Sequence, residues 1–137
     1  MKIYTVVETE ESFCEPFIMK TEGARSFKSL SFAENDMANR IIERAQRDCV
    51  FSRALWNDEN HGEEFREFML QNTCREDVDA YFHRYNCNKM EFPEDVKRVM
   101  CRFILDVVVG EKAYHIYSCR MDELTFHLDI VESELEV

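Results

Sequence analysis

The stretch Pro93–Gly110, PEDVKRVMCRFILDVVVG, decides the fold. Its apolar residues recur with the i, i+3, i+4, i+7 spacing of one helical face over four turns. Pro93 suits the start of a helix because its missing N–H is not needed there, and Gly110 suits the left-handed residue that ends one. We therefore predict a buried helix against which the other elements pack. Its inward residues are Val96, Val99, Met100, Phe103, Ile104, Val107 and Val108.

The N-terminal end of the chain predicts a hairpin. Residues 2–8 have the alternating pattern of a strand. Glu8–Glu15 is polar and acidic and is predicted to be a loop, after which Phe17–Met19 forms a second short strand that pairs back onto the first. Gly23 is expected to end this strand.

Two capping boxes predict helix starts, because the Ser or Thr hydroxyl and the Glu carboxylate satisfy exposed backbone N–H groups reciprocally. Ser31–Glu34 opens a helix that either stops near Arg47 or runs on to Trp56. Thr73–Glu76 opens another, with Val78, Tyr81, Phe82 and Tyr85 on one side. A short helix over Glu63–Asn72 precedes it, with Phe65, Phe68 and Met69 inward.

The C-terminal end predicts a second hairpin, formed by residues 113–121 and 124–131 around Asp122 and Glu123. Strands at both ends with helices between them favour the α+β class. We expect an antiparallel sheet of about four strands, the N-terminal hairpin plus the C-terminal hairpin, with three to five helices packed on one face. The length of 137 residues is that of a single domain, residues 1–137, with a core of its own.

The charge balance limits the kinds of partner. The chain has 17 basic and 28 acidic side chains and a net charge of −11. Direct binding to nucleic acid or to an anionic membrane requires a cationic surface, so both are disfavoured. No apolar run reaches the ~18 residues of a membrane span, and no signal-type stretch follows Met1. The six cysteines are widely spaced, which indicates reduced thiols and a cytoplasmic protein.

The motifs of common enzymes are absent from the sequence. The three glycines are too scattered for a P-loop or a dinucleotide-binding fingerprint, and there is no G-x-S-x-G nucleophile elbow. We therefore predict no catalytic residue, no metal and no cofactor. A small Cys/His-dependent enzyme is the alternative.

Two groupings of His and Cys are candidates for metal ligands. His83 and Cys87 are four residues apart, but the helix is expected to end at Asn86 between them. In the C-terminal hairpin, a two-residue turn makes paired positions sum to 245, which puts His115 on one face and His127 on the other. Cys119 would then share the face of His115, and a three- or five-residue turn would change this parity. Neither grouping has the paired ligand spacing of a zinc site.

Acidic residues cluster in three segments, Glu8–Glu15, Asp58–Glu67 and Asp129–Glu136, which supply our candidate partner-binding surface. In the last segment, Glu132, Glu134 and Glu136 point the same way if the final strand continues, at about twice the 3.3 Å rise of a strand. Such a row can imitate phosphates to a cationic groove, although solvated faces and protected strand edges carry similar charge. Trp56 is included as an aromatic beside the second segment. The candidates are Glu8, Glu10, Glu11, Asp58, Glu59, Glu63, Glu64, Glu67, Glu132, Glu134, Glu136 and Trp56.

A basic stripe on the first predicted helix is a counter-signal. It consists of Arg40, Arg44 and Arg47. Asp36 and Glu43 stand four residues before Arg40 and Arg47, so i, i+4 ion pairs are expected to neutralise the stripe. A basic docking face is the alternative interpretation.

Together these observations favour a non-enzymatic acidic module that binds a basic protein partner, a nuclease or nucleic-acid-binding effector. Its most concrete form is an inhibitor that occupies the partner's nucleic-acid-binding surface, as small acidic phage or mobile-element (anti-CRISPR-like) proteins do, an analogy of size and charge. An immunity protein or antitoxin that neutralises a basic toxin is an alternative with the same chemistry. A homodimer through an edge of the sheet is also open.

Overall fold

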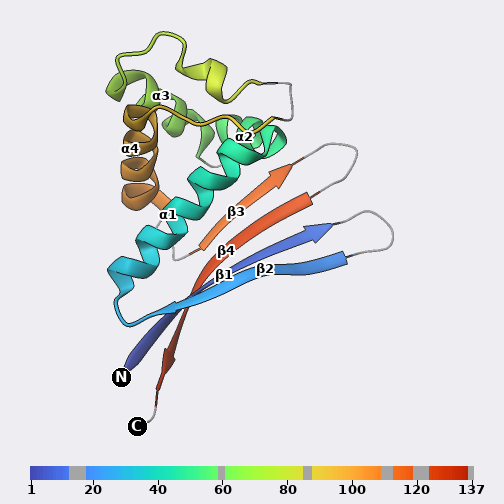
Figure 1. The fold of residues 1–137 in the computed structure, drawn as a ribbon, viewed down its shortest axis with the longest axis vertical. Coiled ribbons are helices and arrows are strands. Elements are labelled where there is room, and N and C mark those ends of the chain that lie inside the picture. The colour runs from blue at the N-terminus through green and yellow to red at the C-terminus, as the bar shows by residue number, and fades with distance from the viewer. Residues whose placement is uncertain (13–17, 59–60, 85–87, 109–112, 119–123, 136–137) are drawn as a thin grey trace.

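The fold is that of a computed structural model (Figure 1). It describes residues 1–12, 18–58, 61–84, 88–108, 113–118 and 124–135. Side chains are described at 1–9, 23–58, 61–84, 88–106 and 128–135.

The predicted α+β class and the antiparallel arrangement of the sheet are confirmed. The two hairpins join through β1 and β4, the first and last strands of the chain, which are therefore central in the sheet. The strand order is β2-β1-β4-β3. Figure 1 shows the helices gathered on one side of the sheet, with α1 lying across it. The strands are β1 (Lys2–Ser12), β2 (Ile18–Phe27), β3 (Ala113–Ser118) and β4 (Leu124–Glu134).

The helices follow the predicted order, with differences at their ends. No helix among the described residues combines the length and the apolar character that a bilayer crossing needs. The α-helices are α1 (Leu30–Arg47), α2 (Cys49–Trp56), α3 (Gly62–Asn72) and α4 (Glu94–Phe103). A 3₁₀-helix, η1 (Val78–Tyr81), and a π-helical segment, η2 (Ile104–Val108), complete the set.

The predicted inward face of Pro93–Gly110 is confirmed where side chains are described. Val96, Val99, Met100, Phe103 and Ile104 are all buried in the core. The α-helix ends at Phe103, however, and continues as the π-helical η2. In the sequence the change comes just before a run of three valines, a residue type whose β-branching lowers helix propensity. The predicted stop at position 110 lies outside the described residues.

The first predicted capping box is wrong. α1 begins at Leu30, and Ser31 lies within its first turn, where its carbonyl accepts a hydrogen bond from the Asn35 side chain at 2.9 Å. The helix starts before the predicted cap because Leu30 already packs against the core as the chain leaves β2. The open question of where the helix ends is answered by Asp48. Its Oδ1 accepts hydrogen bonds from the backbone N–H groups of Val50 and Phe51, so α1 stops and α2 starts with its own cap.

The second predicted capping box is also wrong. The Thr73 hydroxyl donates to the Met69 carbonyl at 2.6 Å, so this residue closes α3 instead of opening a new helix. Only the single turn of η1 follows. The apolar positions Val78 and Phe82 are nevertheless buried, as their spacing predicted.

The strands are longer than predicted. β1 continues through the expected loop as far as Ser12, and β2 continues past Gly23 to Phe27. At Gly23 the register of the β1–β2 pair shifts by one residue, as in a β-bulge, which breaks the simple alternation without ending the strand. Residues 13–17, which include part of the predicted loop, lie outside the described residues.

The register of the C-terminal hairpin corrects the predicted turn. Ser118 pairs with Leu124 and His115 pairs with His127, so paired positions sum to 242. The connection spans residues 119–123 and is therefore longer than the two-residue turn on which the prediction depended. The changed parity places His115 and His127 directly opposite each other, contrary to the prediction.

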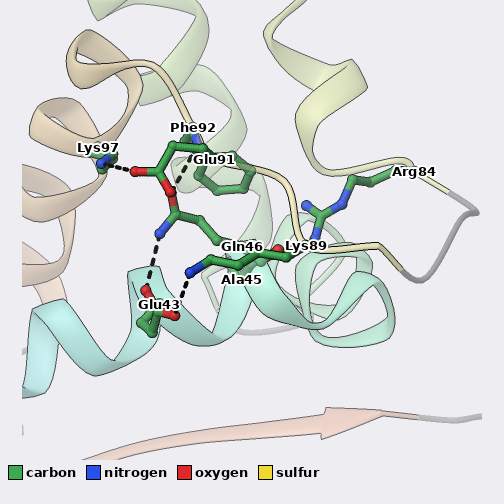
Figure 2. Close-up of polar contacts among 8 residues, drawn as sticks. All are labelled: Glu43, Ala45, Gln46, Arg84, Lys89, Glu91, Phe92 and Lys97. Atoms are coloured by element: carbon green, nitrogen blue, oxygen red, sulfur yellow. Dashed lines mark hydrogen bonds and ion pairs between the residues drawn. The ribbon is translucent and has the colours of Figure 1, made fainter.

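A buried polar cluster holds the C-terminal end of α1 (Figure 2). Arg84, which is 5% exposed, donates from Nη2 to the carbonyls of Ala45 and Gln46 at 2.9 and 2.7 Å. The Gln46 carbonyl also accepts from the N–H of Met90 at 2.9 Å, and its Oε1 accepts from the N–H of Phe92 at 2.8 Å. Burial lowers the pKa of the Arg84 guanidinium. These contacts satisfy carbonyls that a helix end leaves open, and they tie the segment before α4 to α1.

Replacement of Arg84 by Leu tests this cluster. The variant keeps apolar bulk beside Phe92 but removes the Arg84 donor from the Ala45 carbonyl and leaves the Gln46 carbonyl with the Met90 N–H alone, so we expect the free energy of unfolding to fall by about 2 kcal/mol. Chemical denaturation measures the change. Arg98→Leu, at an exposed position of α4, is the control and should change stability by less than ~0.5 kcal/mol. Equal effects in both variants would contradict the role of Arg84.

A second pair of variants tests which residue caps a helix. Asp48→Ala removes the acceptor for two N–H groups of α2 and should cost about 1 kcal/mol of unfolding free energy. Ser31→Ala should cost little, because its side chain does not cap α1. Both are measured by thermal unfolding. A larger loss for Ser31→Ala than for Asp48→Ala would show that the capping box predicted from sequence is correct after all.

Candidate functional site

The α3 helix presents carboxylates outward because its apolar side is fully used by the core. Phe65 and Met69 are buried, and Phe68 packs on the Phe103 ring of α4 with centroids 5.6 Å apart. Gly62 fits α3 closely against the end of α2, since a Cβ there would lie 3.1 Å from the Trp56 carbonyl. The opposite side of the helix is exposed and carries Glu63, Glu64 and Glu67.

The bases within this stretch of the chain are engaged elsewhere. Arg66 donates a hydrogen bond to the Trp56 carbonyl. Arg75 binds both carboxylate oxygens of Asp95 on α4, at 3.1 and 2.9 Å. The Arg75 guanidinium lowers the pKa of the Asp95 carboxyl through this hydrogen bond. Both arginines therefore serve the fold, and neither forms an ion pair with a carboxylate of α3 among the described residues.

The acidic surface continues beyond α3 into η1. Glu76, Asp77 and Asp79 are exposed, and η1 packs beside α3 (Figure 1). We call the six residues Glu63, Glu64, Glu67, Glu76, Asp77 and Asp79 the α3–η1 acidic surface. Within the described part of the chain none of the six takes part in an ion pair. The last three are not among the candidates from the sequence, which predicts Glu76 in a capping box that does not form.

The other members of the second acidic segment have local roles or are not described. The Asp58 carboxylate accepts the backbone N–H of His61 at 3.1 Å, in the turn that leads into α3. Glu59 lies outside the described residues. The predicted partner contact of Asp58 stays a prediction.

The first acidic segment does not form an outward surface at Glu8. Its side chain is only 13% exposed and lies on the helix-covered face of β1, 3.9 Å from Arg40 of α1. Arg40 also binds Asp36 at 2.8 Å, as the i, i+4 spacing predicted. Glu10 and Glu11 are in β1, but their side chains are not described.

The third acidic segment lies at the end of the molecule opposite to α3 (Figure 1). Glu132 and Glu134 share a face of β4, as predicted for a continued strand. Each has a cation beside it on β1: Lys2 Nζ is 3.6 Å from Glu132, and the N-terminal amino group is 3.1 Å from Glu134. Glu136 lies outside the described residues. The acidic segments therefore do not converge on one face.

Trp56 is a core residue, so its predicted place on an exposed interface is wrong. It is 5% exposed, and its ring stacks on Phe82 at 4.8 Å and meets Phe65 edge-on at 5.8 Å. Its ring therefore packs between α2 and the aromatic residues Phe65 of α3 and Phe82, which follows η1. It offers no surface to a partner.

The basic stripe of α1 is largely used within the fold. Arg44 is buried and lies 3.3 Å from Asp48. The predicted Glu43–Arg47 pair is replaced by contacts of Glu43 with Lys89, at 3.5 Å, and with the side-chain amide of Gln46, at 3.4 Å (Figure 2). The predicted neutralisation is thus seen at Arg40 but not at Arg47, which is exposed.

The groupings of His and Cys form no ligand cluster in the described residues. No three His, Cys, Asp or Glu side chains of this part of the chain are placed to hold a metal ion together. His83 packs edge-on against Trp56 at 6.1 Å, and Cys87 lies outside the description. The side chains of His115 and His127 are likewise not described. Of the thiols, Cys49 is buried, Cys74 is exposed, and burial raises the pKa of the half-buried Cys101.

Comparison of the chain with protein-family models, with curated proteins and with solved structures finds no match. The α3–η1 acidic surface is therefore the feature from which we propose a function.

The effect of Arg75 on the pKa of Asp95, beside this surface, can be tested by pH titration. Asp95 has a lowered pKa because Arg75 stabilises its charged form, so this stabilisation is complete above the ordinary pKa of Asp and is lost as the pH falls through the lowered value. Arg75→Gln should return the Asp95 midpoint toward its ordinary range, measured by carboxyl NMR. Lys97→Gln is the matched control: it should raise the lowered pKa of Glu91 and leave Asp95 unchanged. An Asp95 midpoint that does not respond to Arg75→Gln would contradict the pair.

Proposed function

We propose that this protein is a non-enzymatic acidic module that binds a basic protein partner through the α3–η1 acidic surface. The observation that carries the proposal is the separation of charge in this region. Six carboxylates face solvent, while Arg66 and Arg75 are turned to a backbone carbonyl and to Asp95. The surface therefore presents negative charge without ion pairs to a cationic partner, although the charge of Arg75 also acts on Asp77.

The spacing of the carboxylates supports mimicry of a nucleic-acid backbone. Glu63 and Glu67 are four residues apart on α3, about 6 Å along the helix axis. Two successive phosphate steps of one DNA strand rise by about 6.8 Å along its axis. A groove that arranges Lys and Arg to follow phosphates can meet these carboxylates at a similar interval.

The partner that fits this chemistry is a nuclease or another nucleic-acid-binding effector whose cationic groove the module occupies. Small phage-encoded or mobile-element inhibitors of host defence have comparable size and charge, and this likeness supports an inhibitory role in the cytoplasm. An immunity protein for a basic toxin would use the same surface. Identification of the captured partner separates the two.

The test is capture of partners by the immobilised chain from a cell lysate, followed by competition. Capture should be strong at low ionic strength and weaken steeply as salt shortens the ~10 Å screening length of 0.1 M salt. Duplex DNA or RNA should release the captured protein, because it competes for the same groove. The double variant Glu63→Gln/Glu67→Gln should lower capture at least tenfold.

The matched control is Glu34→Gln/Glu43→Gln on α1, which removes the same two charges from the net −11. If the position of the charges matters, this variant should still capture the partner. If only net charge matters, it should lose capture as much as Glu63→Gln/Glu67→Gln does. Binding that is independent of salt, or that nucleic acid does not release, would exclude the proposed mode.

A further inference from the structure

Near the C-terminal end of β4, no described strand pairs with the side of the strand that faces β3, and we call this side the open edge. β1 pairs with β4 along its whole length, from Leu124 to Glu134. On the other side β3 pairs with it only from Leu124 to Asp129. Among the described residues, no strand lies against that side of residues 131–134, and all four are exposed.

The backbone polarity of this edge follows from the ladder with β1. The N–H of Leu135 donates to the carbonyl of Met1 at 2.8 Å, which makes this a hydrogen-bonded position of an antiparallel pair. Hydrogen-bonded positions alternate, so Ser133 and Val131 also turn their backbone groups toward β1. Glu132 and Glu134 therefore turn their N–H and C=O groups toward the open edge. Such groups are a template for an added strand.

The side chains beside the open edge divide into two kinds. Glu132 and Glu134 lie on one face and are 43% and 65% exposed, so the bases beside them on β1 leave much of each carboxylate accessible. Val131 and Leu135 lie on the other face and are each about half exposed. A strand added here meets carboxylates on one face and apolar side chains on the other.

A second copy of the chain is a poor occupant. In an antiparallel pair of two such edges, residues with outward backbone groups must pair with each other. Three registers are then possible. Glu132 faces Glu132 of the copy, Glu132 faces Glu134 of the copy, or Glu134 faces Glu134 of the copy. Every register thus places like charges directly opposite, which destabilises a sheet.

We propose that this edge binds an extended basic segment of a partner protein as an additional strand. The segment carries Lys or Arg at two alternating positions, opposite Glu132 and Glu134, with an apolar residue between them on the side of Val131. Charge selects the partner, and four backbone groups of β4 supply the hydrogen bonds. The site lies at the opposite end of the molecule from the α3–η1 acidic surface and does not depend on it (Figure 1).

The probe is the acetylated and amidated peptide Thr-Lys-Val-Lys-Val-Lys-Thr, added to the full chain at low salt and followed by amide NMR and hydrogen exchange. In the free chain, the amides of Glu132 and Glu134 should exchange faster than those of Val131 and Ser133. On saturation with the peptide, exchange at Glu132 and Glu134 should slow by about tenfold, as two new backbone hydrogen bonds imply.

The control peptide has the same sequence with a methyl group on the backbone nitrogen of each lysine. It keeps every charge but lacks the N–H donors that face β4, so its affinity should be at least about tenfold lower. Equal affinity of the two peptides would overturn the proposal, because charge alone would then explain binding. Failure of the first peptide to bind at millimolar concentration would overturn it too.

Variants of β4 distinguish the contribution of the carboxylate charges to peptide binding from that of the backbone hydrogen bonds. Glu132→Gln/Glu134→Gln should weaken peptide binding about fivefold at low salt. Glu132→Pro removes in addition an N–H that faces away from β1, so it should weaken binding more than Glu132→Gln while leaving the amide spectrum of β1 intact. Glu63→Gln/Glu67→Gln should leave peptide binding unchanged, so the failure of either surface is detected separately. A dimer in sedimentation with Glu132 and Glu134 protected in the free chain would show that a second copy occupies the edge, and would overturn the proposal.

Discussion

The fold depends on how the carbonyl end of α1 is closed. A helix end that is buried must find donors for its last carbonyls, and here they come from Arg84 and Met90. Because Gln46 also accepts from Phe92, the segment that leads into α4 is tied to the same point. α4 then places its apolar face against α1 and α3. Packing of that face would be poorly defined without this anchor, since apolar contacts alone are not directional.

The same arrangement explains where the negative charge of the protein is found. The bases that are described are mostly used within the fold: Arg84 closes α1, Arg40 lies between Asp36 and Glu8, and Arg75 holds Asp95. Each of these contacts engages a cation within the fold. The carboxylates of α3 have no such task, because the inner side of that helix is apolar. The carboxylates of α3 therefore stay without an ion pair within the described part of the chain.

The sheet carries a second acidic feature at the other end of the molecule. Helices cover one face of it, and β4 extends past β3, so the last residues of β4 are bounded by β1 alone among the described strands. Glu132 and Glu134 are compensated on the β1 side by Lys2 and the N-terminal amino group. The molecule thus carries two acidic features of different kinds, a helical surface and a strand edge, which face different surroundings.

The sequence by itself determined what depends on local spacing. The burial of Val96, Met100 and Phe103 followed from the 3.6-residue period, and the Asp36–Arg40 pair from its i, i+4 separation, because one element contains all the necessary information. The outward position of Glu63 and Glu67 followed in the same way from the apolar side of α3. Only the tertiary structure decided what depends on which groups meet. Ser31, Asp48 and Thr73 are all suitable caps, and burial of neighbouring segments selects Asp48. The stacking of Trp56 in the core and the opposition of His115 and His127 depend on contacts between distant residues, for which the sequence contains no local signal. The same holds for the end of β4, which among the described strands pairs with β1 alone.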